Sequence, residues 1–161
     1  MGKLYFHYST MNAGKSTMLL QAAYNYLERG MLVYLLTAKL DQRAGDAKIA
    51  SRIGLSMDAQ TFEAETNIYD QLSEAYSKDG DDKAPFACVF VDEAQFLSKE
   101  QVWQLARFVD EYNVPVMCYG LRVDFRGELF PGSSTLLALA DELREATMVV
   151  RRAEDGTAAK E

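Results

Sequence analysis

The octapeptide STMNAGKS at residues 9–16 constrains the fold of this chain more than any other segment. It follows a short apolar run at residues 4–8 and precedes a stretch with helical spacing at residues 17–29. A strand, a loop of small residues ending in Gly-Lys-Ser and a helix together form a phosphate-binding loop. This pattern predicts a nucleoside triphosphate as ligand and phosphoryl transfer or triphosphate hydrolysis as the chemistry.

In such a loop, successive main-chain N–H groups point into one concavity and donate hydrogen bonds to phosphate oxygens. The following helix adds its N-terminal donors and the positive end of its dipole. Gly14 lets the backbone approach the anion, Lys15 brings a mobile charge to the outer phosphates, and Ser16 offers a hydroxyl to Mg²⁺. The usual pattern opens with Gly where this chain has Ser9, which needs an ordinary backbone conformation or a strain that the loop absorbs. A chance turn before a helix is the alternative, but the Gly-Lys-Ser-Thr run falls at a strand-to-helix junction.

A pair of carboxylates, Asp92 and Glu93, ends the apolar run at residues 86–91. Ligands gather at the carboxyl ends of strands in parallel sheets, so we expect Asp92 to lie near the phosphate-binding loop and to hold Mg²⁺. Side chains alternate along a strand, which points Glu93 elsewhere and suits it to accept a proton from an attacking hydroxyl or water. Apolar strands also often end in acids at a helix start, and this is the alternative explanation for the pair taken alone.

The alternation of apolar runs with helical patterns predicts an α/β domain with a mostly parallel sheet and flanking helices. Strands are expected at residues 3–8, 31–37, 86–91 and 115–119, and helices at residues 17–29, 68–77, 98–109 and 134–143. Ser98 and Gln101 have the spacing of a capping box at the start of the third helix. Residues 38–55 are interpreted as a functional loop that includes a short element, or else as a solvated connection, and residues 122–133 as a second loop.

The composition limits the class of protein. The 161 residues include 48% hydrophobic and 25% charged residues, which suits one soluble globular domain. No apolar run approaches the ~20 residues that span a bilayer and no secretory signal is evident, so we expect a cytoplasmic protein without a membrane partner. A formal net charge of −7 disfavours a nucleic-acid partner. Cys88 and Cys118 are interpreted as buried hydrophobic side chains and His7 as a structural histidine.

Four motifs, in order, resemble the bacterial type II thymidine kinases. They are YSTMNAGKST at residues 8–17, SRIGL at 51–55, VDEAQFL at 91–97 and CYGLRVDFRGELF at 118–130. The similarity extends from about residue 2 to about residue 143 and includes the serine at position 9. It implies a P-loop NTPase-type, RecA-like α/β fold and ATP-dependent phosphorylation of the 5′-hydroxyl of thymidine to thymidine monophosphate in nucleotide salvage. It also implies a homotetramer.

The resemblance implies roles for the residues that match these motifs. Glu93 would be the general base on the 5′-hydroxyl, and Ser16 and Asp92 would hold Mg²⁺. The ATP site would comprise Ser9, Thr10, Met11, Asn12, Ala13, Gly14, Lys15, Ser16, Asp92, Glu93, Ala94 and Gln95.

The nucleoside pocket follows from the same resemblance. Phe125 matches the aromatic residue that stacks on the thymine ring, and Phe96 and Phe130 match others that line the pocket. Arg43 and Arg52 lie in a polar stretch from which they could reach phosphates.

The chain departs from this family near its C-terminal end. Members carry a zinc ribbon with four cysteine-type ligands and a lasso loop over the nucleoside, whereas this sequence has no Cys-x-x-Cys and no His–Cys cluster. Residues 141–145 resemble the family's last helix, and residues 146–152 a strand that normally follows the first pair of zinc ligands. We therefore predict a kinase domain at residues 1–143 and a remnant of the zinc-ribbon and lasso region at 144–161. We expect the natural protein to carry further residues between these pieces and after Glu161.

Two other functional classes are compatible with the phosphate-binding loop and are considered as alternatives. A nucleic-acid-coupled P-loop ATPase would carry the same loop and carboxylate pair, together with basic or aromatic loops for strands. A regulatory nucleotide-binding domain would keep the loop without turnover, and the intact Lys15 and Glu93 argue against it. Turnover of ATP with thymidine, other nucleosides and single-stranded DNA distinguishes the three classes.

Overall fold

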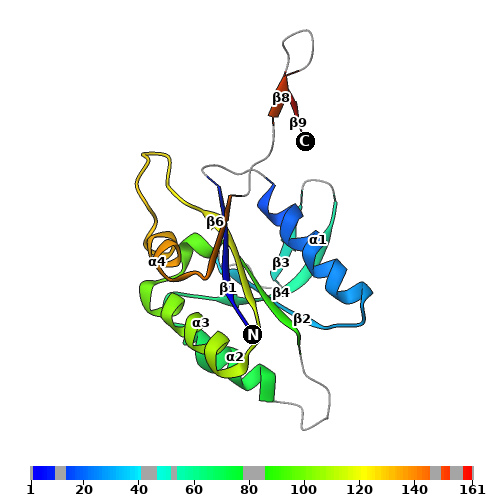
Figure 1. Ribbon diagram of the computed structural model, residues 1–161, viewed down its shortest axis with the longest axis vertical. Helices are drawn as coiled ribbons and strands as arrows, with labels where there is room; N and C mark the ends of the chain where they lie inside the picture. The colour runs from blue at the N-terminus through cyan, green and yellow to red at the C-terminus, as the bar shows by residue number, and fades with distance from the viewer. Residues whose placement is uncertain are drawn as a thin grey trace.

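The apolar runs of the sequence lie side by side in a seven-stranded sheet (Figure 1). The computed structural model describes residues 2–9, 14–40, 47–51, 54–77, 86–145, 150–152 and 158–160. Across the sheet the strands lie in the order β3 (Ala47–Ala50), β4 (Ser56–Phe62), β2 (Val33–Ala38), β5 (Cys88–Asp92), β6 (Val116–Leu121), β1 (Leu4–Ser9) and β7 (Glu142–Glu145). Strands β8 (Val150–Arg152) and β9 (Ala158–Lys160) form a separate antiparallel pair.

All neighbouring strands of the large sheet are parallel except β3 and β4. In the register of the sheet, Ser9 at the end of β1 pairs with Leu121 of β6, and Thr37 of β2 pairs with Asp92 of β5. The ends of β1, β5 and β6 therefore meet at one edge, where ligands of open α/β sheets bind. This arrangement confirms the predicted α/β class with a mostly parallel sheet.

Helices cover both faces of the sheet. Helix α1 (Lys15–Glu28) lies on one face, and α2 (Ile68–Ser77), α3 (Lys99–Tyr112) and α4 (Pro131–Leu139) lie on the other, as Figure 1 shows. A short 3₁₀ turn, η1 (Ala94–Phe96), connects β5 to α3. The predicted capping box is confirmed, because the Gln101 N–H donates to the Ser98 hydroxyl at 3.1 Å and the Ser98 N–H donates to the Gln101 side chain at 2.9 Å.

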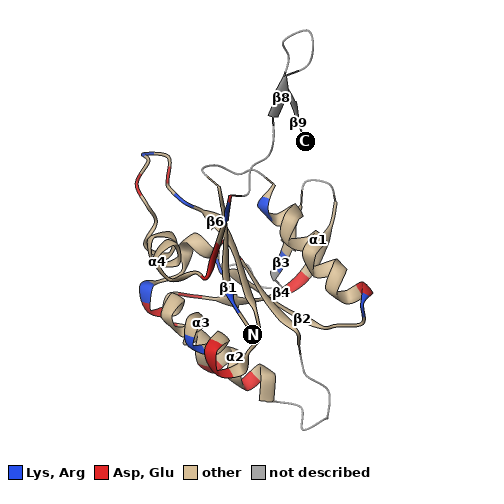
Figure 2. Ribbon diagram, in the orientation of Figure 1, with Lys and Arg blue, Asp and Glu red and all other residues tan. Residues whose placement is uncertain are grey.

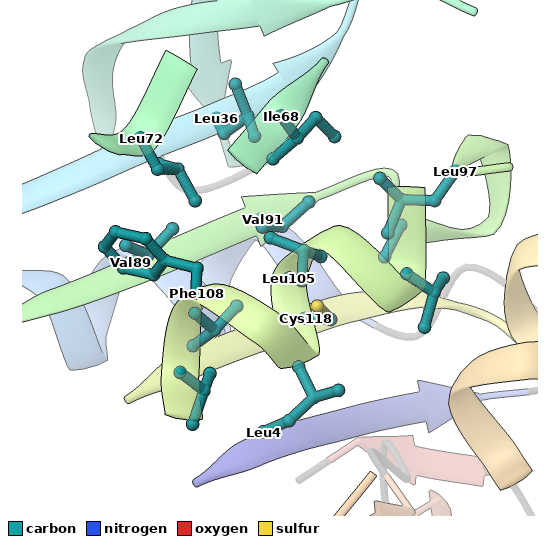
Figure 3. Close-up of a cluster of buried hydrophobic side chains, with 14 of the residues drawn as sticks. Leu4, Leu36, Ile68, Leu72, Val89, Val91, Leu97, Leu105, Phe108 and Cys118 are labelled. Atoms are coloured by element: carbon teal, nitrogen blue, oxygen red, sulfur yellow. The ribbon is translucent and has the colours of Figure 1, made fainter. Parts of the chain in front are cut away.

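The hydrophobic core is divided between the two faces of the sheet. Beneath α2 and α3, Leu105 and Phe108 pack in one cluster with Val89 and Val91 of β5 (Figure 3). Phe90 points to the opposite face and packs in a second cluster beneath α1. Each such fully buried side chain contributes about 1.5–3 kcal/mol. Burial on both faces thus holds rigidly the strand that ends in the carboxylate pair.

The two cysteines are buried, as predicted from their apolar surroundings. Burial raises the pKa of the Cys88 thiol to about 12, so this side chain stays a neutral thiol at physiological pH. His7 is also buried, and its ring stacks on that of Tyr119 with 4.4 Å between the centroids. This position agrees with the structural interpretation of His7.

The prediction of a helix at residues 134–143 is wrong at both ends. Helix α4 begins at Pro131, whose fixed φ suits a first helical position, and ends at Leu139. The Asp141 N–H then donates to the Leu4 carbonyl at 2.7 Å, and the Leu4 N–H donates to the Asp141 carboxylate at 2.8 Å. These bonds bring the following residues beside β1.

The family's last helix, expected at residues 141–145, is likewise absent at its place: residues 142–145 form strand β7, parallel to β1. Pairing with a strand distant in sequence has overridden local helical spacing. Strand β7 includes residues on both sides of the predicted boundary between residues 1–143 and 144–161. That division of the chain into two parts stays a prediction.

Strands β3 and β4 lie where no strand was predicted. Strand β3 falls within the polar stretch at residues 38–55 and pairs antiparallel with β4. Along β4 the side chains alternate between exposed and partly buried, so this strand lacks the continuous apolar run of β2 or β5. Over the described part of the chain, no helix is long and apolar enough to cross a membrane.

Candidate active site

The end of the predicted phosphate-binding loop leads directly into α1. Gly14 precedes the helix with a φ of 75°, a left-handed conformation that glycine adopts without the steric cost of a Cβ. Lys15 and Ser16 form the first turn, with Lys15 only 4% exposed. Ser9 is buried at the end of β1, where its carbonyl accepts a hydrogen bond from the Arg122 N–H at 2.8 Å. The remaining predicted residues of the loop, Thr10, Met11, Asn12 and Ala13, lie outside the described residues.

A direct hydrogen bond joins the phosphate-binding segment to the Asp92–Glu93 carboxylate pair. The Ser16 hydroxyl donates to Oδ2 of Asp92 at 3.0 Å, although the residues are 76 positions apart. Asp92 is 4% exposed, and its other oxygen, Oδ1, has no hydrogen-bond partner among the described residues. The structure thus places Asp92 beside the start of α1, as the parallel-sheet argument predicted.

The carboxylate of Asp92 lies in an environment that disfavours its charge. Burial and the neighbouring charge of Glu93 raise its pKa, while hydrogen bonds from the Ser16 hydroxyl and the Glu93 backbone and the charge of Lys15 act in the opposite direction. A divalent cation would stabilise the ionised form. A hydroxyl and a buried carboxylate oxygen without a partner are oxygen donors of the type that Mg²⁺ prefers, so Ser16 and Asp92 fit a magnesium site.

Glu93 turns away from the sheet for a different reason than strand alternation. Strand β5 ends at Asp92, and Glu93 has a φ of 55° and a ψ of 40° at the start of η1. A left-handed conformation at a residue with a Cβ costs roughly 1–3 kcal/mol and tends to persist at functional sites. The direction of Glu93 is therefore set by this turn, and its side chain is partly exposed.

The side chain of Gln95 is 3% exposed and bonded to protein at both ends. Its Nε2 donates to Oε2 of Glu93 at 2.7 Å, and its Oε1 accepts from the Leu121 N–H at 3.1 Å. Ala94, beside it in η1, is also buried. Sequence reasoning placed Gln95 in the ATP site and did not foresee either contact.

Gly120 is a residue of the site that sequence reasoning missed. A Cβ at this position would lie 2.8 Å from Oε1 of Gln95 and 2.8 Å from its main-chain nitrogen. The signal was available, since glycine in a strand interior often marks the close approach of another backbone.

The predicted aromatic residues occupy two places. The rings of Phe96 and Phe130 contact each other edge to face, with 5.9 Å between their centroids. Phe125 lies in the segment between β6 and α4 and is 92% exposed, with the Arg126 guanidinium 5.3 Å from its ring centroid. Hydrogen bonds from the N–H groups of Arg126 and Glu128 to the Asp124 carboxylate shape the turn that presents this ring. The predicted phosphate contacts Arg43 and Arg52 lie outside the described residues.

Comparison with known proteins identifies the family. A family model described as thymidine kinase matches residues 2–156. The chain belongs to the thymidine kinase family. A thymidine kinase of Jannaschia sp. (strain CCS1) is 60% identical over 171 aligned positions, which cover 100% of this chain and 85% of the relative. The thymidine kinase of Ruegeria pomeroyi is 58% identical over 100% of this chain and 84% of its own length. That of Rhizobium meliloti is 59% identical over 94% of this chain and 81% of its own.

Membership of the thymidine kinase family confirms the resemblance based on four motifs. The structural zinc of that resemblance has no fitting ligands among the described residues, which contain no cluster of three or more His, Cys, Asp or Glu able to hold a metal. Cys88 packs in the cluster beneath α1, whereas Cys118 packs in the cluster on the opposite face of the sheet. The two thiols therefore cannot serve one tetrahedral centre.

Proposed function

We propose that the chain is a thymidine kinase, which transfers the γ-phosphoryl group of ATP to the 5′-hydroxyl of thymidine. The observation that carries this proposal is the hydrogen bond between Ser16 and Asp92. It places the carboxylate pair beside the start of α1, where we expect the phosphates to bind. Family membership over residues 2–156 supports the same assignment. ADP and thymidine monophosphate are the products.

On the phosphate side, the chain supplies donors and charge. The N-terminal amides of α1 and the buried Lys15 stabilise the negative charge of the outer phosphates. Ser16 and Asp92 would hold Mg²⁺, which would neutralise charge that develops on the phosphate oxygens. These groups are fixed before the reaction, so little reorganisation is needed as charge develops.

On the acceptor side, Glu93 is the general base. The 5′-oxygen of thymidine attacks the γ-phosphorus while its proton passes to the Glu93 carboxylate, and the bond from that phosphorus to the β–γ bridging oxygen breaks. ADP leaves with the electron pair of that bond. The position of Glu93, one residue beyond Asp92, supports this role because it brings the base next to the magnesium site.

Aromatic side chains suit the base of the nucleoside. The exposed ring of Phe125 offers a flat apolar face, and stacking a nucleobase on such a ring contributes about 1–3 kcal/mol. The Phe96–Phe130 pair offers a second apolar surface. Enclosing the nucleoside between such side chains excludes water, which would otherwise compete as the acceptor.

The nucleic-acid-coupled ATPase is the weaker proposal. Acidic and basic residues are interspersed along the described elements in Figure 2, and the whole chain has a formal net charge of −7. Affinity for nucleic acid depends on clustered lysines and arginines that neutralise phosphates. The homotetramer implied by the resemblance stays a prediction, which analytical ultracentrifugation measures.

Turnover of ATP separates these functions. The purified chain is given ATP and Mg²⁺ with thymidine, with another nucleoside or with single-stranded DNA, and ADP release is measured together with thymidine monophosphate. We expect equal amounts of both products, only when thymidine is present. Lys15→Met serves as the blank, because it removes the charge that the phosphates need. ADP release stimulated by DNA and not by thymidine would overturn the proposal.

A further inference from the structure

Gln95 bridges the carboxylate of Glu93 and the main chain of β6. The Leu121 N–H can only donate, so the amide oxygen of Gln95 must face it, at 3.1 Å. This leaves the amide nitrogen to face Glu93, where it donates to Oε2 at 2.7 Å. The orientation of the Gln95 amide, often ambiguous in a glutamine, is thus decided by its neighbours.

The backbone around Gln95 is held from two sides. A Cβ at Gly120 would meet the main-chain nitrogen of Gln95 at 2.8 Å, and a Cβ at Gly132 in α4 would meet the Leu97 carbonyl oxygen at 2.5 Å. The turn η1 therefore lies in close contact with both β6 and α4, and each contact depends on a missing side chain. Such packing leaves Gln95 little freedom to move away from Glu93.

We propose that Gln95 is the positioning residue for the general base, an inference that rests on the proposed role of Glu93. The hydrogen bond fixes the carboxylate of a side chain that otherwise has several rotamers. With Oε2 bonded to Gln95, the Glu93 carboxylate is held in one orientation, from which it receives the proton of the 5′-hydroxyl. A side chain that is 3% exposed with both amide ends bonded to protein acts through Glu93 rather than through contact with ATP.

The variant Gln95→Met tests this role, since methionine has a similar length but neither donates nor accepts strongly. We expect kcat to fall about 10- to 100-fold, the range in which misplacing a reacting group lies. The KM values for thymidine and ATP should change less than about threefold, because the binding groups are other residues. A normal kcat, or a loss confined to KM, would overturn the proposal.

A double-mutant cycle with Glu93→Gln separates action through Glu93 from an independent effect. If Gln95 acts only by orienting Glu93, then Gln95→Met has less than about a twofold effect on kcat in the Glu93→Gln background. A further tenfold loss in that background would overturn the inference about Gln95 while leaving the proposed function intact. Full activity of Glu93→Gln alone would instead overturn the proposed role of the base.

Gln101 provides a matched control. This glutamine is also buried, and its Nε2 donates to the carbonyls of Glu63 at 2.7 Å and Thr66 at 3.0 Å, away from the carboxylate pair. Gln101→Met should lower Tm and leave kcat unchanged well below the unfolding temperature. If Gln95→Met loses activity only in proportion to its loss of Tm, as a generally destabilised protein does, the positioning role is contradicted.

Gly120→Ala tests the same contact from its other side. The added methyl group would meet both the main-chain nitrogen and Oε1 of Gln95 at 2.8 Å, so rotation of that side chain alone cannot relieve the clash. We expect a lower kcat with a retained thymidine KM, as in Gln95→Met. A folded Gly120→Ala protein with wild-type kcat would contradict the proposal.

Discussion

The Ser16 hydroxyl at the start of α1 donates a hydrogen bond to the Asp92 carboxylate at the end of β5, at 3.0 Å. One contact thereby joins the phosphate-binding segment to the strand that carries the carboxylate pair. Strand β6 lies between β1 and β5 in the sheet, so this bond spans the edge where the parallel strands end. It is the structural basis for our proposal that both residues hold one magnesium ion.

Asp92→Asn should lower the affinity for Mg²⁺ without lowering the stability of the fold. Removing the charge should raise the Mg²⁺ concentration for half-maximal activity by about tenfold or more, because a neutral amide is a poorer ligand for a hard cation. Stability should not fall, since the variant removes a buried charge. Titration of activity with Mg²⁺, beside the exposed control Asp110→Asn, measures the effect. Identical magnesium curves for the two variants would exclude Asp92 from the metal site.

Glu93→Gln should abolish most of the chemistry and preserve binding. We expect kcat to fall by roughly 10²-fold or more, because the amide cannot accept the proton of the 5′-hydroxyl. Affinity for ATP should remain, since the phosphate donors lie in α1. Steady-state kinetics measures the loss of kcat, and calorimetric titration with a non-hydrolysable ATP analogue measures the affinity for ATP. A variant with full activity removes Glu93 as the base.

Phe125→Ala should weaken thymidine binding without destabilising the protein. The ring is 92% exposed and contributes little to the core, so Tm should stay unchanged. Loss of stacking should reduce thymidine affinity by about 1–3 kcal/mol. Trp103→Ala on α3 is a matched control, because it removes another exposed aromatic ring and should leave thymidine affinity unaltered. Equal thymidine affinities for the Phe125 variant and the wild type would disprove the stacking role.

His7 should make the fold sensitive to acid. Burial is the main cause that lowers the pKa of His7 to about 4; the charge of Arg144 acts in the same direction and Glu142 opposes it. The unfolded chain, with an ordinary histidine pKa near 6.5, therefore binds a proton more readily between about pH 6.5 and pH 4. The stabilisation by neutral His7 is complete above this window and is lost as the pH falls through it. The loss is about 3 kcal/mol at about 1.4 kcal/mol per pH unit.

His7→Phe tests this dependence, because phenylalanine keeps the ring beside Tyr119 and removes the titrating group. Urea unfolding between pH 7 and pH 4 should show a shallower decline of stability in the variant than in the wild type. Parallel declines in the two proteins would show that other groups cause the acid sensitivity.

The sequence alone predicted the strand before the loop, the helix after it and the position of Asp92 beside that helix. The pattern around Gly14, Lys15 and Ser16 predicts a strand, loop and helix because each residue type satisfies a local requirement of the backbone or the phosphate. The placement of Asp92 followed from a general property of parallel sheets. That property puts Asp92 at the ligand-binding edge of the sheet, and the strand order β5, β6, β1 brings it close to α1.

The remaining features depend on contacts between distant segments. Strand β7 pairs with β1 next to the hydrogen bond between Leu4 and Asp141, and no local pattern at residues 141–145 reveals that pairing. The left-handed turn at Glu93 and the close contact between Gly120 and Gln95 are set by tertiary packing. Local periodicity carries no information on such contacts, which is why the direction of Glu93 and the role of Gln95 were not foreseen.

The most direct test of the proposed mechanism is a crystal structure of the chain with thymidine, Mg²⁺ and a non-hydrolysable ATP analogue. We expect the 5′-hydroxyl to lie about 3 Å from the Glu93 carboxylate and to face the γ-phosphate, with Lys15 on the phosphates. Thymidine bound away from the ends of β1 and β5, or a Glu93 carboxylate separated from the 5′-hydroxyl by the triphosphate, would contradict the mechanism.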